Sequence, residues 1–147
     1  MDKITVSGVI LTPLKQIFHP KGDVFHGMKA SDLGYDGFGE AYFSTIHCDD
    51  IKPWKRHLRM TLNFVIPVGK IRFVIYDDRT DSPTKNSFFD VTLGEGNYQR
   101  ITIPAEVWVA FRGIGTGLNL LLNIASIEHD PTEIERKEKL EDIKYDW

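Results

Sequence analysis

Alternating apolar and polar positions run through most of this chain and predict β-strands. The clearest run spans residues 58–66, and a second one follows at residues 70–77. The two runs are joined by Pro67-Val68-Gly69, which favours a turn and predicts a β-hairpin over residues 65–75. Further strands are expected at residues 4–11, 88–93, 98–103, 107–111 and 118–124.

Turn residues separate these runs at 81–83, 94–97 and 113–117. Short strands at such spacing are typical of a β-sandwich or a closed roll. The 147 residues have the length of one domain with one core, so we expect a single all-β domain over residues 1–147.

Two segments favour helix instead. Residues 12–18 start with Thr12 and Pro13, which suit a capped first helical turn. Residues 131–142 start after Asp130 and carry two apolar positions among many charges, which predicts a short C-terminal helix with a solvated charged face. His129 is expected to help that helix begin.

Composition limits the classes of partner. The formal net charge is −3 with acids and bases interspersed, which argues against a nucleic-acid-binding protein. Cys48 is the single cysteine, so an internal disulfide is excluded and a reducing compartment is favoured. The sequence shows neither a membrane-length apolar run nor a signal-peptide profile, and we expect a cytoplasmic protein without a membrane partner.

Two stretches carry a likeness to a known family. Residues 77–84, Asp-Asp-Arg-Thr-Asp-Ser-Pro-Thr, resemble the D-x-R-x-x-S-P-T segment of dTDP-4-dehydrorhamnose 3,5-epimerases. Residues 97–111 resemble the R-Q-L-x-I-P-x-G-x-A-H-G-F segment of the same proteins, at a matching distance along the chain. Shorter similarities at residues 19–25 and 38–40 extend the likeness over most of residues 15–135.

This resemblance implies a double-stranded β-helix, the cupin jelly roll, in a protein that is usually a homodimer. Members epimerise C3 and C5 of nucleotide-linked 4-keto-6-deoxy sugars and use neither metal nor other cofactor, in surface-polysaccharide or deoxysugar biosynthesis. Their chemistry is proton abstraction next to a carbonyl, so a base and an acid face opposite sides of the sugar ring and other groups stabilise the enolate.

The resemblance places the catalytic base at His57, an imidazole that titrates near neutral pH. Alternation puts Lys55, Arg59 and Asn63 on the same face as His57. That face can line a barrel lumen or meet solvent, and the sequence leaves both open. In a lumen, Lys55 or Arg59 would stabilise an enolate or hold phosphate.

Several positions depart from the family pattern. Trp54 replaces an Arg, and Val109 replaces a His that would also be needed for a cupin metal site. The family's acidic Tyr falls near Leu121 or Leu122, and the carboxylate that orients the base is expected beyond Trp147, where this chain ends.

Other polar residues are candidates for substrate contacts. Trp108 is either a core residue or a stacking platform. The candidates for a sugar contact or a proton relay are Glu40, Tyr42, Asn63, Tyr76 and Asn123, and the choice among them stays open.

Three functions are compatible with the sequence. The first is an epimerase or isomerase acting on a nucleotide-linked keto-sugar. The second is a non-catalytic sugar- or nucleotide-binding module that keeps the fold, and the third is a structural β-domain that docks a partner.

Overall fold

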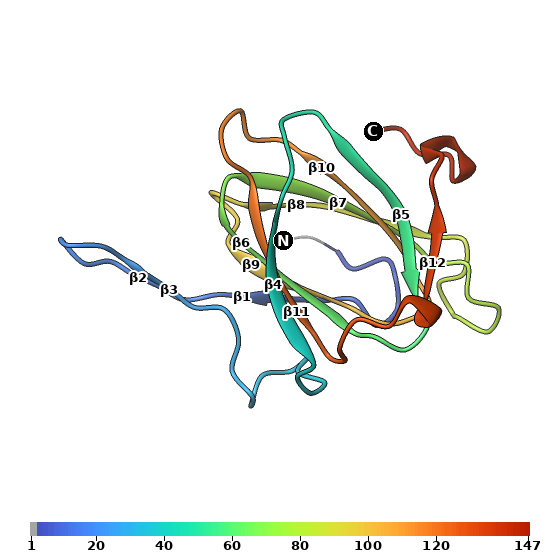
Figure 1. Ribbon diagram of the computed structural model, residues 1–147, viewed down its shortest axis with the longest axis horizontal. Coiled ribbons are helices and arrows are strands. Elements are labelled where there is room, and N and C mark those ends of the chain that lie inside the picture. Colours follow the sequence, from blue (N-terminus) through green and yellow to red (C-terminus); the bar gives the residue numbers. More distant parts are fainter. Residues whose placement is uncertain (1–2) are drawn as a thin grey trace.

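The computed structural model describes residues 3–147 and consists almost entirely of β-strands (Figure 1). Two five-stranded antiparallel sheets face each other, with strand orders β1-β9-β6-β11-β4 and β12-β5-β10-β7-β8. The first sheet contains β1 (Ile10–Pro13), β4 (Glu40–Thr45), β6 (Leu62–Val68), β9 (Gln99–Ile103) and β11 (Leu120–Ala125). The second contains β5 (Ile51–His57), β7 (Lys70–Tyr76), β8 (Phe88–Gly94), β10 (Trp108–Gly113) and β12 (Ile134–Lys137). This confirms the all-β prediction, and the two facing sheets are the arrangement that a jelly roll requires.

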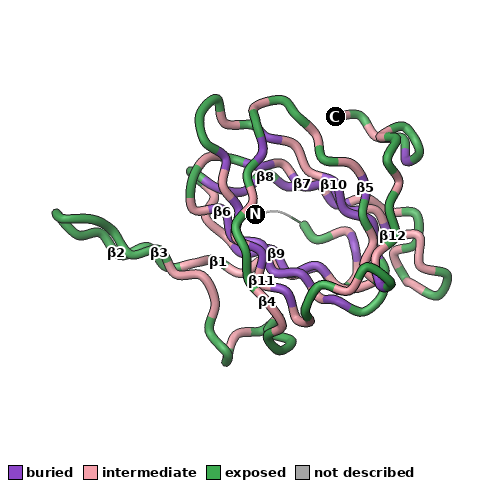
Figure 2. Tube along the Cα trace, in the orientation of Figure 1, coloured by how far each residue is buried: buried purple, intermediate pink, exposed green. Residues whose placement is uncertain are grey.

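The main core fills the space between the sheets, where the strands of Figure 2 are buried. Phe64 of the first sheet stacks on Phe73 of the second, with ring centroids 5.4 Å apart. Phe111 lies 5.6 Å from Phe73 and extends this aromatic contact along β10. Burial of these rings supplies much of the driving force that holds the sheets together.

A second apolar cluster covers the outer face of the second sheet. Trp54 and Trp108 lie there under the C-terminal segment, with Ile143 buried against them. The indole Nε1 of Trp54 donates to the carbonyl oxygen of Leu140 at 3.0 Å, which fastens the segment to the sheet.

The predicted helix at residues 12–18 is wrong. β1 reaches Pro13, and the chain then forms β2 (Gln16–Ile17), which pairs with β3 (Val24–Phe25). These two short strands make an arm that projects away from the sheets in Figure 1. Pairing of β1 with β9 outweighs the local helix signal of Thr12-Pro13, because the strand hydrogen bonds continue through residue 13.

The predicted C-terminal helix is also wrong. Residues 131–133 and 140–142 form two single 3₁₀ turns, η1 (Pro131–Glu133) and η2 (Leu140–Asp142). Between them β12 pairs with β5, so a segment that reads as a charged helix is the edge strand of the second sheet. A four-residue strand shows too few alternating positions to be recognised in a sequence whose composition favours helix.

The hairpin predicted over residues 65–75 does not form. β6 pairs with β9 and β11, whereas β7 pairs with β8 and β10 in the opposite sheet. The Gly69 link therefore crosses between sheets. It has a φ of 82°, and a Cβ there would lie 2.3 Å from Oδ1 of Asn119, so only glycine fits this crossing.

The alternating run at residues 58–66 is a strand only from Leu62 onwards. β5 ends at His57, the chain bends at Leu58 and Arg59, and β6 begins at Leu62. His57 and Asn63 consequently belong to different sheets, and the single polar face expected across them does not exist.

Across residues 3–147, no helix has the length and apolar character needed to cross a membrane. The same residues include no cluster of three or more His, Cys, Asp or Glu side chains that could ligate a metal ion.

Candidate active site

A cavity of about 210 Å³ lies between the two sheets and combines an apolar floor with a polar wall and mouth. Alternation along β5 turns Pro53, Lys55 and His57 towards it, while Trp54 and Arg56 face the outer cluster. The apolar lining consists of Met60, Leu62, Phe64, Val109, Phe111, Leu121 and Ile134. The remaining polar lining consists of Glu40, Tyr42, Ser44, Lys52, Asn123, His129 and Arg136.

His57 lines this cavity and is paired with Glu133, which is not itself among the lining residues. Nδ1 of His57 lies 2.5 Å from Oε1 of Glu133, and the side chains are 13% and 2% exposed. The second carboxylate oxygen of Glu133 accepts from the backbone N–H groups of Arg59 and Met60 at 3.1 and 3.2 Å. The carboxylate therefore fixes the ring orientation and holds the proton on Nδ1, which leaves Nε2 free as a base.

Glu133 is ionised because its hydrogen bonds outweigh its burial. Burial alone would raise its pKa, but the bonds from His57, Arg59 and Met60 bring the pKa below the usual glutamate range. A fixed carboxylate next to one ring nitrogen is the arrangement by which histidine side chains are oriented for proton transfer.

Cationic side chains stand at the mouth of the cavity. Lys52, Lys55 and Arg136 all contribute to its lining. Although Lys55 is exposed as a residue, partial removal of its ammonium from water lowers its pKa, and repulsion by Arg136 and Lys52 lowers it further. Such a group gains from an anionic ligand, because a neighbouring negative charge restores its protonated form.

Tyr42 and Asn123 supply polar groups from the opposite sheet. The two residues are directly paired across β4 and β11, and Nδ2 of Asn123 donates to the Tyr42 hydroxyl at 2.9 Å. Asn123 is 2% exposed, and its Oδ1 has no hydrogen-bond partner within residues 3–147. A buried unpaired acceptor is costly, so this oxygen is suited to a donor on a bound ligand.

The structure brings five of the predicted site residues together: His57, Lys55, Glu40, Tyr42 and Asn123 line this one cavity. Arg59 and Asn63 lie elsewhere, because Arg59 is in the bend after β5 and alternation along β6 turns Leu62 and Phe64, but not Asn63, towards the cavity. The Arg59 side chain is 60% exposed and pairs with Asp130, and Asn63 accepts from the buried guanidinium of Arg100 at 3.1 Å.

Trp108 is likewise outside the cavity. It is buried in the outer cluster, its Nε1 donates to Asp78 at 3.0 Å, and the Arg56 guanidinium lies 4.7 Å from its ring. Its neighbour Val109 faces the cavity instead, as strand alternation requires. Tyr76 also points away, since its hydroxyl bonds Asn86.

Sequence reasoning missed Glu133 and His129. The sequence places Glu133 on the solvated face of a predicted helix and His129 at the start of that helix. The carboxylate expected beyond Trp147 is thus supplied by Glu133 within the chain. Asp130-Pro131 was the available signal: Asp130 caps the η1 turn by accepting from the Thr132 N–H at 3.0 Å, and this turn delivers Glu133.

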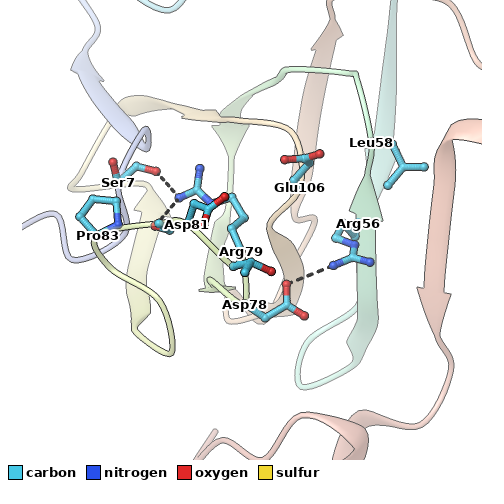
Figure 3. A pocket seen from close by; sticks show the side chains of 10 residues that line it. Ser7, Arg56, Leu58, Asp78, Arg79, Asp81, Pro83 and Glu106 are labelled. Carbon is cyan, nitrogen blue, oxygen red and sulfur yellow. Dashed lines mark hydrogen bonds and ion pairs between the residues drawn. The ribbon is translucent and has the colours of Figure 1, made fainter.

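A larger and more open depression of about 570 Å³ is lined mainly by residues 78–83 of the β7–β8 loop, together with Ser7, Arg56, Leu58 and Glu106 (Figure 3). Both cations of its lining already have partners, because Arg56 binds Asp78 at 3.1 Å and Arg79 binds Asp77 at 2.9 Å. The residues that line it include no histidine. The smaller cavity, with its oriented imidazole and unpaired polar atom, is the better candidate for chemistry.

The fold and the cavity together define a β-sandwich protein with an oriented imidazole in a cavity between its sheets. No family model matches the chain. The chain is 38% identical to a dTDP sugar isomerase of Desulfovibrio desulfuricans G20, over 97% of this chain and 92% of that one, with a TM-score of 0.92.

Two further proteins are similar to this chain. The chain is 38% identical over 91 residues to a Haloferax volcanii protein named "Probable low-salt glycan biosynthesis epimerase Agl13", a match that covers 61% of this chain and spans 58% of that relative's length. The RmlC epimerase of Mycobacterium tuberculosis is 14% identical with a TM-score of 0.81, over 92% of this chain and 71% of that one, and shares the fold. The chain belongs to the RmlC-like family of sugar-nucleotide epimerases and isomerases.

Proposed function

We propose that this protein epimerises or isomerises a nucleotide-linked 4-keto-6-deoxy sugar in the biosynthesis of a glycan or deoxysugar. The observation that carries this proposal is that His57, which lines a cavity between the sheets, is held at 2.5 Å from the buried carboxylate of Glu133. The family and the names of its relatives support the substrate class, and the jelly-roll fold supplies the cavity.

The proposed reaction starts with proton abstraction by Nε2 of His57 from the carbon next to the sugar carbonyl. Electrons of the broken C–H bond move into an enolate, and the Glu133 carboxylate stabilises the imidazolium that is left. Lys55, Lys52 and Arg136 at the mouth suit the diphosphate of the nucleotide, and the apolar floor of Phe64 and Leu121 suits a deoxygenated sugar carbon.

Hydrogen–deuterium exchange tests this reaction. In D₂O, the protein should introduce deuterium next to the carbonyl of dTDP-4-keto-6-deoxyglucose, followed by ¹H NMR, and His57→Asn should abolish it. Glu106→Gln, in the larger depression, is the matched control and should exchange like the parent protein. Failure of the parent to exchange deuterium into any of several nucleotide-linked 4-keto sugars would overturn the enzymatic proposal. If dTDP nevertheless raised the melting temperature, the binding-module alternative would be supported.

We extend the proposal to a homodimer in the cytoplasm, in line with the single free cysteine and the sequence resemblance. Apolar side chains on the projecting arm support the dimer, because Phe18 is 81% exposed and Val24 is 51% exposed. On the edge strand β4, Phe43 is 66% exposed and could be covered in the same assembly.

Light scattering should give the mass of a dimer, and Phe18→Ser with Phe43→Ser should shift it towards the monomer. A monomeric parent at micromolar concentration would contradict this.

A further inference from the structure

The Tyr42–Asn123 pair lies on the sheet opposite to the base, and its hydrogen bond has a defined direction. Nδ2 of Asn123 donates to the Tyr42 oxygen at 2.9 Å, so the phenolic proton is not used in this bond. Direct cross-strand pairing of the two residues holds this arrangement in place. The phenol therefore keeps its O–H for another acceptor.

Position and surroundings distinguish Tyr42 from the other phenols near the sheets. Tyr42 lines the same cavity as His57 but comes from β4 of the first sheet, whereas His57 comes from β5 of the second. Tyr76 bonds Asn86, and Tyr145 donates to Asp90 at 2.7 Å, both away from the cavity. The Tyr42 residue is also 49% exposed, so its oxygen can exchange protons with water.

Asn123 has a buried acceptor that no donor in the described part of the chain satisfies. Its Oδ1 faces no donor within residues 3–147 although the residue is 2% exposed and lines the cavity. A sugar hydroxyl that satisfies this oxygen would rest against β11, next to the phenol and across from the imidazole. β11 itself has no Tyr, and Tyr42 of the neighbouring strand β4 is the one phenol among the residues that line the cavity.

We infer that Tyr42 is the catalytic acid of the proposed epimerisation and that Asn123 is the positioning residue that keeps its proton directed at the substrate. This inference rests on the proposed function. His57 removes a proton from one face of the carbon next to the carbonyl, and the C–H electrons form the enolate. The Tyr42 O–H then gives its proton to the opposite face, the enolate electrons form the new C–H bond, and a phenolate remains. Water returns a proton to the phenolate and takes one from the imidazolium, so nothing else is consumed.

The test separates exchange from inversion in dTDP-4-keto-6-deoxyglucose. Without the acid, His57 still removes and returns a proton on its own face, so Tyr42→Phe should wash deuterium into recovered substrate at a rate close to that of the parent. Formation of inverted sugar should fall by about 10²–10⁴-fold, the usual contribution of a general acid. Tyr76→Phe is the matched control and should change neither rate.

A second variant tests the direction of the hydrogen bond. A carboxylate only accepts, so Asn123→Asp would turn the Tyr42 proton towards residue 123 and should slow inversion as Tyr42→Phe does, while exchange persists. Circular dichroism and melting temperature confirm that each variant is folded. Parent-like inversion by folded Tyr42→Phe would overturn the inference, and so would equal loss of exchange and inversion, which indicates a structural or binding role. A parent without any exchange would instead overturn the proposed function itself.

Discussion

At the scale of single residues, the site depends on a carboxylate that binds three donors at once. Glu133 accepts from the His57 ring and from two backbone N–H groups at the bend between β5 and β6. One side chain therefore fixes both the His57 ring and the bend that follows it. This coupling explains why a residue with charged neighbours in the sequence is 2% exposed in the structure.

Glu133→Gln should reduce turnover much more than ligand binding. The amide can donate to Nδ1, which stabilises the wrong tautomer and puts the proton on Nε2. We expect kcat to fall by about 10²–10⁴-fold with little change in the Kd for dTDP. Steady-state kinetics and calorimetry measure the two quantities.

The control is Glu135→Gln, two residues further on. Glu135 is half-exposed and pairs with Arg56 at 2.6 Å on the other side of β5, so its loss should cost about 1 kcal/mol or less and leave kcat unchanged. Equal effects of the two variants on kcat would refute the role given to Glu133.

At the scale of elements, the family-like motif at residues 77–84 holds the β7–β8 loop in one conformation through its own hydrogen bonds. Asp77 is fully buried and accepts from the guanidinium of Arg79 and the hydroxyls of Ser82 and Thr84. Burial would raise the Asp77 pKa, but these donors together lower it far below its ordinary value. The residues that carry the resemblance at this segment therefore hold the loop together and do not line the small cavity.

Asp77→Asn should remove an acid-dependent part of the stability. Because the folded pKa is depressed, the unfolded chain binds the proton first, so the contribution is complete above the ordinary value of 3.8 and is lost as the pH falls below it. We expect the variant to lose roughly 3 kcal/mol at neutral pH and to show a flatter decline in acid. Urea unfolding between pH 2 and 7 measures both.

Asp81→Asn in the same loop is the control, since Asp81 is exposed. It should unfold like the parent protein at every pH. An Asp77→Asn variant with the same acid dependence as the parent would show that this carboxylate does not lock the loop.

At the scale of the whole molecule, the sequence predicted the strand content but not how strands are shared between sheets. Residues 62–68 and 70–76 are strands as expected, yet they lie in opposite sheets, because alternation defines a strand and not its partner. For the same reason, alternation alone did not show that His57 and Asn63 lie in different sheets. His57 and Lys55 reach the cavity together because they lie on one face of one strand, which a period of two does predict.

The rest of the site comes from contacts that local sequence does not encode. Glu133 reaches His57 across 76 residues because β12 pairs with β5, and Tyr42 meets Asn123 across 81 residues through the pairing of β4 with β11. Non-local pairing outweighed helical composition at residues 131–142, and this segment contains Glu133, one of the two residues that sequence reasoning missed.

A crystal structure with bound dTDP-4-keto-6-deoxyglucose and the His57→Asn variant tests the central claim most directly. We expect the sugar ring between the two sheets, with a carbon next to the carbonyl about 3–3.5 Å from the side chain at position 57 and the diphosphate near Lys55. A sugar bound instead in the depression near Asp78 and Arg79, or held in the cavity with its carbonyl turned away from position 57, would contradict the account.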